Sequence, residues 1–131
     1  MRCLKIVDKW VTLILSGNKT WEIRRKNTKI RERIALGNTK SKCCVGYATI
    51  ADSVEMTVEE LKIHNDEHQA NDFLDKYAER RETLFAWVLE EVEVEKKPMR
   101  YAHSTGSWCR ILNENQNRKD SVEVSFKVES T

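Results

Sequence analysis

The chain has 131 residues and a net charge of +2, which predicts one domain with its own core and leaves too little length for two. Hydrophobic residues make up 40% and charged residues 34%, and no apolar run approaches the ~18 residues of a membrane span, so a soluble globular protein is expected. The first residues have the pattern of neither a signal peptide nor a transit peptide, which predicts a cytoplasmic location.

The chain opens with a predicted strand and a short helix. Residues 3–7 form an apolar run, and Asp8 after them suits a helix N-cap. Apolar side chains then recur at helical spacing over residues 10–15. Gly17 can take the positive φ at which helices end, so we expect the helix to stop there.

A second strand is predicted directly after this helix, over residues 20–25. Alternation places Glu22 and Arg24 together on the face opposite the packed one. Such a pair is either an ordinary surface ion pair or part of a polar site for phosphates and hydrogen-bond donors. Strict alternation would put Lys19 on the packed face, so we expect the strand to begin near Thr20 and leave Lys19 on the turn, able to reach the polar face.

Two further strands and two acidic helices are expected in the middle of the chain. Residues 33–36 are strand-like, Gly37 and Asn38 signal a turn, and a strand with a bend or bulge at Gly46 follows over 42–54. The helices occupy residues 57–81.

The first acidic helix has a clear start signal. Thr57 and Glu60 have the spacing of a capping box, so the helix should begin at Thr57. A polar stretch over 65–71 interrupts the pattern, and a second apolar stripe then runs to about residue 81.

The clearest strand pattern in the sequence lies over residues 84–95. This predicted strand begins with apolar residues on both faces. Pro98 is expected to stop it. A short strand over 107–112 and an amphipathic strand over 122–128 follow. Six or seven strands with two or three helices predict an α+β fold, in which a mixed or antiparallel sheet curls into a barrel.

No metal or cofactor site is predicted. The four cysteines form no Cys-x-x-Cys motif, and adjacent Cys43 and Cys44 on a strand would point to opposite faces, so free thiols are expected. His64 and His68 share one helix face, but Asn65 stands where the zinc-protease motif needs Glu. Both histidines are therefore expected to be solvated.

Charge is divided unevenly along the chain. Residues 19–42 contain nine basic and two acidic side chains, a balance of 9 − 2 = +7, whereas residues 55–95 contain four basic and thirteen acidic ones, 4 − 13 = −9. The basic segment is either a face for a polyanion such as RNA or a solvated loop. The acidic helices are an alternative surface, for a protein partner.

Three segments carry side chains suited to nucleic-acid chemistry, and they could converge. They are the turn and strand with Lys19, Glu22 and Arg24, the loop with Ser107 and Trp108, and the start of the strand over 84–95. Lys and Arg suit phosphates, and Trp can stack on an unpaired base. A Trp such as Trp108 is more often a core residue than a stacking platform, and Lys19 could merely offset the helix dipole. No hydrolase triad accompanies them, which leaves metal-free acid–base chemistry or plain binding.

Five motifs occur in order within residues 3–112. They are Leu-Ser-Gly-Asn-Lys-Thr-Trp-Glu-Ile-Arg (15–24), Val-Gly-Tyr-Ala-Thr-Ile (45–50), Phe-Ala-Trp-Val-Leu-Glu (85–90), Lys-Pro (97–98) and Gly-Ser-Trp (106–108). Together they resemble the ASCH (activating signal cointegrator homology) domain family, whose fold is related to the PUA RNA-binding domain. The Gly-x-Lys-Thr-x-Glu-x-Arg core is the most specific part of the resemblance.

The resemblance implies a PUA-like mixed β-barrel of about six strands with two or three flanking helices. One domain is expected over residues 1–131, and residues 113–131, which follow the part covered by the resemblance, are expected to form a C-terminal extension that ends in a strand. It also implies a cleft beside the Lys-Thr-x-Glu-x-Arg strand, lined on its far side by the Ser-Trp loop. Family members bind RNA or modified nucleobases, and some cleave single-stranded RNA.

The leading hypothesis is an RNA-binding domain that can also act as a metal-independent ribonuclease. Lys19 would stabilise the scissile phosphate or protonate the leaving oxygen, Glu22 would help to deprotonate the 2′-hydroxyl, and Ser107 would hydrogen-bond a phosphate oxygen. The expected nucleic-acid contacts are Arg24, Arg25, Lys26 and Trp108.

Two other functions stay open. One is a non-catalytic reader of RNA or of a modified nucleobase. The other is an amidohydrolase acting on acetylated cytidine-type nucleosides, as in a subgroup of the resembled family that uses a Lys and a Thr nucleophile. Glu22 stands at the position of that Thr, and Thr20 is at best a displaced substitute, so the obvious acyl acceptor is missing.

Overall fold

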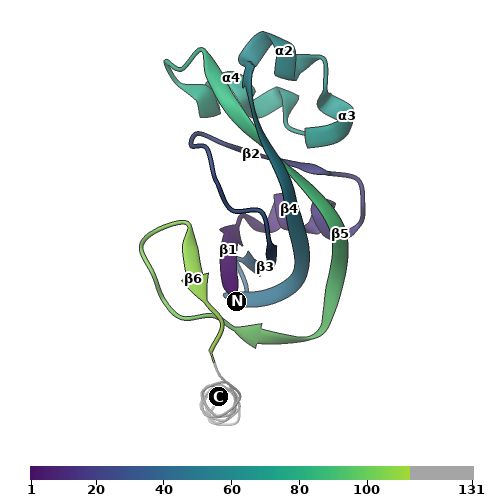
Figure 1. Ribbon diagram of the computed structural model, residues 1–131, viewed down its shortest axis with the longest axis vertical. Coiled ribbons are helices and arrows are strands. Elements are labelled where there is room, and N and C mark those ends of the chain that lie inside the picture. Colours follow the sequence, from purple (N-terminus) through teal and green to yellow (C-terminus); the bar gives the residue numbers. More distant parts are fainter. Residues whose placement is uncertain (113–131) are drawn as a thin grey trace, which may run out of the picture.

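The computed structural model describes residues 1–112, in which one curved sheet carries all the helices (Figure 1). The predicted strand over 122–128 lies outside the described residues. The strands are β1 (Arg2–Ile6), β2 (Trp21–Arg24), β3 (Arg33–Asn38), β4 (Cys43–Thr57), β5 (Thr83–Arg100) and β6 (Trp108–Arg110). The helices are α1 (Asp8–Leu15), α2 (Val58–Lys62), α3 (Asn65–His68), the 3-10 helix η1 (Asn71–Phe73) and α4 (Leu74–Ala78).

The sheet is mixed, with the strand order β2-β5-β4-β3-β1-β6. Strands β1 and β3 run parallel, and every other neighbouring pair is antiparallel. This confirms the predicted α+β class and the six-stranded mixed sheet. The two edge strands, β2 and β6, do not pair with each other within residues 1–112, so the sheet curls without closing into a barrel.

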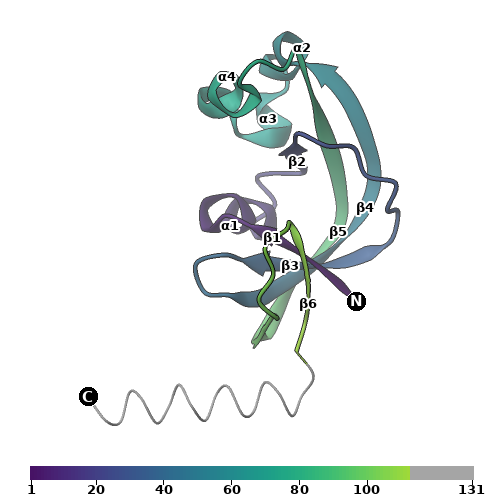
Figure 2. The ribbon, with the colours of Figure 1, turned by 90° about the vertical axis from the view of Figure 1, so that its left-hand side faces the viewer.

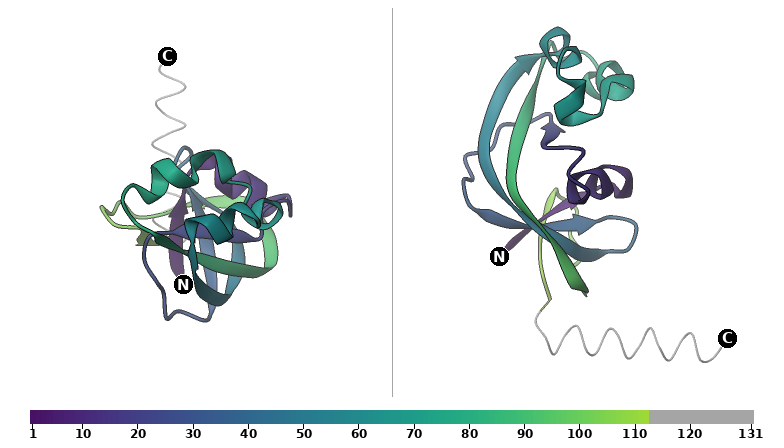
Figure 3. Two further views of the ribbon diagram at one scale, coloured as in Figure 1. Left: turned by 90° about the horizontal axis from the view of Figure 1, so that it is seen from above. Right: turned by 90° about the vertical axis from the view of Figure 1, so that its right-hand side faces the viewer.

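Long strands β4 and β5 form a bent wall that supports two separate groups of helices on its concave side. Helix α1 covers one end of the wall, and α2, α3 and α4 cover the other (Figure 2). The right-hand view of Figure 3 shows the same division from the opposite side. Each group buries its own apolar cluster, around Val11 and Ile14 of α1 and around Leu61, Leu74 and Ala78 of the other helices.

Local signals near the first helix are partly confirmed. Gly17 has φ +86° directly after α1, as predicted. Asp8 is wrong as an N-cap, because Val7 holds that position and the Asp8 carboxylate instead accepts a hydrogen bond from Asn38 Nδ2 at 2.7 Å. Gly37 and Asn38 lie within β3, and the turn follows them, where the Asn38 side chain accepts the backbone N–H of Lys40 at 2.8 Å.

Two predictions in the second half of the chain were wrong in detail. Pro98 does not stop β5, because β2 pairs only with residues 85–88 and leaves this stretch of β5 as a sheet edge, where proline costs no ladder bond. The acidic segment forms three short α-helices and a 3-10 turn instead of two helices. The capping box of Thr57 and Glu60 is present as predicted.

None of the helices within residues 1–112 combines the length and the apolar character needed to cross a membrane.

Candidate functional site

The turn after α1 determines where Lys19 lies. The backbone N–H groups of Asn18 and Lys19 both donate to Leu13 O at 3.1 Å, which closes the helix end. Thr20 then joins the rest of the fold, because its N–H donates to Glu67 O at 2.8 Å and its carbonyl accepts from Leu89 N–H at 2.9 Å. Strand β2 begins only at Trp21, so Lys19 stands before the strand alternation, as predicted.

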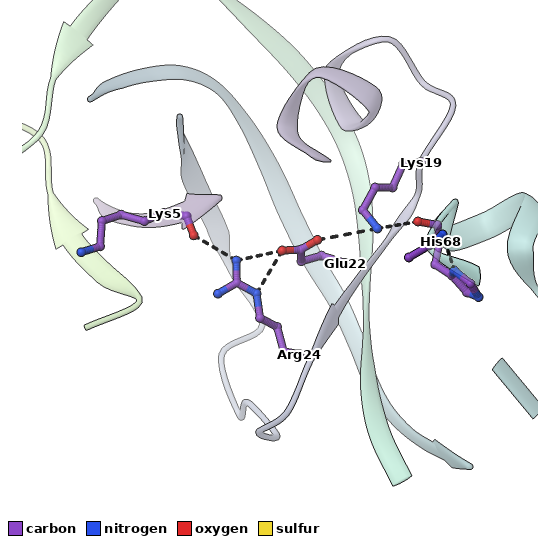
Figure 4. Close-up of polar contacts among 6 residues, drawn as sticks. Lys5, Lys19, Glu22, Arg24 and His68 are labelled. Carbon is purple, nitrogen blue, oxygen red and sulfur yellow. Dashed lines mark hydrogen bonds and ion pairs between the residues drawn. The ribbon is translucent and has the colours of Figure 1, made fainter. Parts of the chain in front are cut away.

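The Lys19 ammonium is buried between the two helix groups, with its side chain 1% exposed. Nζ donates to His68 O at 2.6 Å and lies 3.7 Å from Glu22 Oε1 (Figure 4). It also lies 5.0 Å from the centre of the Trp10 ring. Burial lowers the pKa of Lys19, although the neighbouring Glu22 carboxylate opposes this effect. A lysine with a lowered pKa is a better proton donor near neutral pH than a solvated one.

Glu22 is held in place by Arg24, its neighbour on the same strand face. The Arg24 guanidinium donates through Nε and Nη2 to Glu22 Oε2 at 3.0 and 2.8 Å, and Nη2 also donates to Lys5 O at 3.0 Å (Figure 4). Glu22 is therefore a buried carboxylate between two cations. Since one negative charge faces two positive ones, the group carries a net charge of +1 and favours an anionic ligand.

These three side chains form part of the lining of a cavity of about 620 Å³ between α1, β2 and the η1–α4 segment, which we call the Lys19 pocket. Its volume is in the usual range for small-ligand sites. Three aromatic rings, those of Trp10, Phe73 and Tyr77, are part of the lining, and Trp10 packs edge-to-face on Phe73 with 5.4 Å between ring centres. Additional cations along it are Lys5, Lys9, Arg25 and Lys76.

The remaining predicted site residues line a neighbouring cavity of about 420 Å³, the Trp108 pocket. Ser107 and Lys26 are exposed there, and half-buried Trp108 stacks on Trp87 with 6.0 Å between ring centres and 17° between planes. Arg24 and Arg25 line both pockets. The structure thus brings Lys19, Glu22 and Arg24 together, and places Ser107, Trp108 and Lys26 beside them in the second pocket.

Arg25 is already engaged by α4 and the residue after it. Its Nε donates to Tyr77 O at 2.9 Å, its Nη2 donates to Glu79 Oε1 at 3.2 Å, and its guanidinium lies 4.4 Å from the Tyr77 ring centre. Arg25 therefore lines the pocket and also connects α4, which forms part of the pocket wall, to the end of β2.

His68 is a site neighbour that sequence reasoning missed, since it was expected to be solvated. It is fully buried; its Nδ1 accepts the Ala70 N–H at 2.9 Å, so Nε2 carries the proton and donates to Leu61 O at 2.6 Å. Burial lowers the pKa of His68 and keeps the ring neutral. No signal in the sequence joins His68 to Lys19, because 49 residues separate them.

Thr20 does not occupy the position of a nucleophile for the Lys19 pocket. Its side chain is exposed, and it is not among the described residues that line the cavity. The Thr20 backbone is held in place by its hydrogen bonds to Glu67 and Leu89. For the Thr20 hydroxyl to act as an acyl acceptor in the pocket, these bonds would have to break.

Comparison with known proteins agrees with this fold. A family model described as ASCH domain matches residues 4–99. The crystal structure of ASCH from Zymomonas mobilis aligns at a TM-score of 0.71 and 19% identity, over 92% of this chain and 93% of that one. Two mutant forms of that protein align with the same TM-score and identity, and cover 96% and 94% of their chains. The search of curated proteins found no significant match.

Proposed function

This chain belongs to the ASCH domain family, and from the charged floor of its Lys19 pocket we propose that it binds single-stranded RNA and cleaves it without a metal ion. The observation that carries the proposal is the buried Lys19–Glu22–Arg24 group at the base of an aromatic-walled cavity. Buried side chains in a ligand-sized cavity are pre-organised, so they act on a ligand without first paying for their own ordering.

The lining of the Lys19 pocket suits a nucleotide in both of its parts. The net charge of +1 and the surrounding lysines attract a phosphate, and the rings of Trp10, Phe73 and Tyr77 offer aromatic surface against which a base can pack. A neutral apolar ligand would cover Lys9 and Lys76, which line the pocket and are exposed, and would remove water from their ammonium groups, which costs binding free energy. The pocket therefore favours a nucleotide over an apolar ligand.

The proposed cleavage step uses Lys19 and Glu22 in separate roles. Glu22 Oε1, which lies 3.7 Å from Lys19 Nζ, takes the proton of the 2′-hydroxyl as that oxygen attacks the phosphorus. The bond from phosphorus to the 5′-oxygen breaks, and Lys19 stabilises the transition state and donates a proton to the leaving oxygen. The products are a 2′,3′-cyclic phosphate and a free 5′-hydroxyl. Ser107 would hydrogen-bond a phosphate oxygen from the adjoining pocket.

The test is incubation of purified protein with single-stranded RNA in EDTA. The wild-type protein should produce cyclic-phosphate ends, and Lys19→Met, which keeps the apolar stem and removes the charge, should lower the rate by roughly 100-fold or more. The matched control is Lys29→Met, which removes one exposed charge from the same basic segment outside both pockets. Cleavage that Lys19→Met leaves unchanged would sink the catalytic proposal.

A non-catalytic reader is the second candidate, and one observation favours it. Lys19 and Glu22 already satisfy each other and the backbone of His68, an arrangement that suits fixed recognition as well as proton transfer. RNA binding at low salt without any product would support the reader. We do not propose amidohydrolysis, because Glu22 replaces the nucleophile and Thr20 is exposed outside the pocket.

A further inference from the structure

We propose that the Trp108 pocket is a second nucleotide subsite, so that the site takes a strand of at least two nucleotides in preference to a free nucleotide. The inference rests on the proposed RNA function of the Lys19 pocket. It concerns which form of RNA binds, and it assigns a role to a cavity that the cleavage chemistry uses only through Ser107.

The two pockets adjoin each other, because Arg24, Arg25 and Tyr77 line both of them. A ligand longer than one nucleotide would therefore span the two arginines to reach both pockets. The Arg24 guanidinium lies at this junction, and its Nη1 donates no hydrogen bond to residues 1–112, whereas Nε and Nη2 are both used (Figure 4). The phosphate that joins two nucleotides would receive this remaining donor.

The charge of the Trp108 pocket is suited to a phosphodiester. Three cations, Arg24, Arg25 and Lys26, are among the described residues that line it, and no carboxylate is. Lys26 is exposed and has no ion-pair partner within residues 1–112, so its charge is available to a ligand. Asn27 and Thr28 add polar groups of the kind that contact base edges or sugars.

An aromatic wall of the pocket is held rigidly. Trp108 stacks on Trp87, and Trp87 Nε1 donates to Lys26 O at 3.0 Å. The loop before Trp108 is fixed as well, since Lys5 Nζ donates to Ser104 O at 2.6 Å and Ser104 Oγ donates to Trp108 O at 2.8 Å. A wall that is ordered before binding loses little entropy when a base packs against it.

Lys5 also links the two pockets. Its side chain holds the loop of the Trp108 pocket, and its carbonyl accepts Arg24 Nη2 at the floor of the Lys19 pocket. The Lys5 N–H donates to Ser107 O at 2.9 Å. The same strand residue thus sets the positions of both subsites relative to each other, as a strand-binding site requires.

Isothermal titration calorimetry tests the inference with two sets of probes. The first is the four ribonucleoside 5′-monophosphates, and the second is the four matching 5′-phosphorylated homodinucleotides, in which hydrogen replaces the first 2′-hydroxyl to prevent cleavage. The best dinucleotide should bind about tenfold more tightly than its monophosphate. Trp108→Ala should lower dinucleotide affinity roughly tenfold and leave monophosphate affinity unchanged.

A second variant avoids any dependence on the packing of Trp108. Lys26→Ala removes an exposed side chain, and it should lower dinucleotide affinity roughly threefold without affecting the monophosphate, whereas Lys29→Ala should affect neither. Equal affinities for both probes, or a dinucleotide gain that survives both Trp108→Ala and Lys26→Ala, would overturn the second subsite and leave the proposed function standing. Failure of every monophosphate and dinucleotide to bind would overturn both.

Discussion

At the scale of single residues, the buried charges of the site depend on one carboxylate. Glu22 neutralises part of the charge of Lys19 and of Arg24, and both cations lie where little water reaches them. Burying a charge costs free energy unless a partner compensates it, and removing one member of a buried group leaves the others uncompensated. Glu22 therefore stabilises the folded protein, in addition to being the candidate general base.

Glu22→Gln should lower the free energy of unfolding by about 3 kcal/mol, because two cations would remain with no negative partner. Urea denaturation measures the change. Glu59→Gln is the matched control: its carboxylate pairs with Lys62 on the surface at 3.1 Å, and its loss should be too small to resolve. Equal effects of the two substitutions would contradict the buried role of Glu22.

His68 should make stability depend on pH. Burial lowers its folded-state pKa, so the unfolded chain takes up a proton near pH 6.5 while the folded protein does not. The free energy of unfolding should fall as the pH drops below about 6.5, by at most about 1.4 kcal/mol per pH unit, until the lowered pKa is reached. Above pH 6.5 both states are neutral at this ring, and its contribution is constant. Lys19, which faces His68, further disfavours the imidazolium.

Denaturation between pH 6.5 and 5.5 measures this slope. His68→Gln removes the titrating ring and should flatten it. A slope that persists unchanged in the variant would show that other groups cause it.

At the scale of elements, the last residue of α1, Leu15, comes close to the bent strand β4. Gly46 is the point of contact: a Cβ there would lie 2.5 Å from Leu15 Cδ2 and 2.6 Å from Glu93 O. The β4–β5 ladder also shifts register between Cys44 and Gly46, as the predicted bulge requires. The Leu15 side chain can move, but the Glu93 carbonyl belongs to the sheet and cannot move without displacing it.

Gly46→Ala should therefore lower the free energy of unfolding by about 1–3 kcal/mol through overpacking. Thermal denaturation of the purified variant measures the change. Gly106→Ala provides the control, since a Cβ at Gly106 would meet no atom within 4 Å. If both variants unfolded at the wild-type temperature, the close approach of α1 to β4 would not be a constraint on the fold.

At the scale of the whole molecule, ion pairs neutralise part of the basic segment over residues 19–42. Arg25 pairs with Glu79 and Arg33 with Glu93, both in the acidic region over 55–95, and Arg31 pairs with Asp52 just before that region. The basic segment over 19–42 is thus not a uniformly positive face. The pocket-lining cations with no carboxylate partner within residues 1–112 are Lys5, Lys9, Lys26 and Lys76.

RNA binding should accordingly have a moderate salt dependence. Four phosphate contacts predict a slope of log Kobs against log [NaCl] of about −3, whereas contacts from all nine basic residues of the segment would predict about −6. The slope is measured by fluorescence anisotropy with a labelled single-stranded RNA, at NaCl concentrations from about 50 to about 200 mM. A slope near −6 would mean that the ion pairs open on binding.

The sequence by itself determined the features that depend on near neighbours. The helix stop at Gly17, the capping box at Thr57 and the start of β2 after Lys19 follow from backbone sterics and from hydrogen bonds a few residues apart. The pairing of Glu22 with Arg24 follows from strand alternation in the same way.

Only the tertiary structure decided which of these groups are buried and what they contact. His68 is enclosed because α3 packs against β2, and Pro98 is tolerated because β5 is an edge there. Arg25 and Arg33 are paired with acids more than 50 residues further along the chain. The division of the candidate residues between two pockets was decided at the same level. Exclusion of water depends on which distant elements cover a side chain, and local sequence pattern carries no information about that cover.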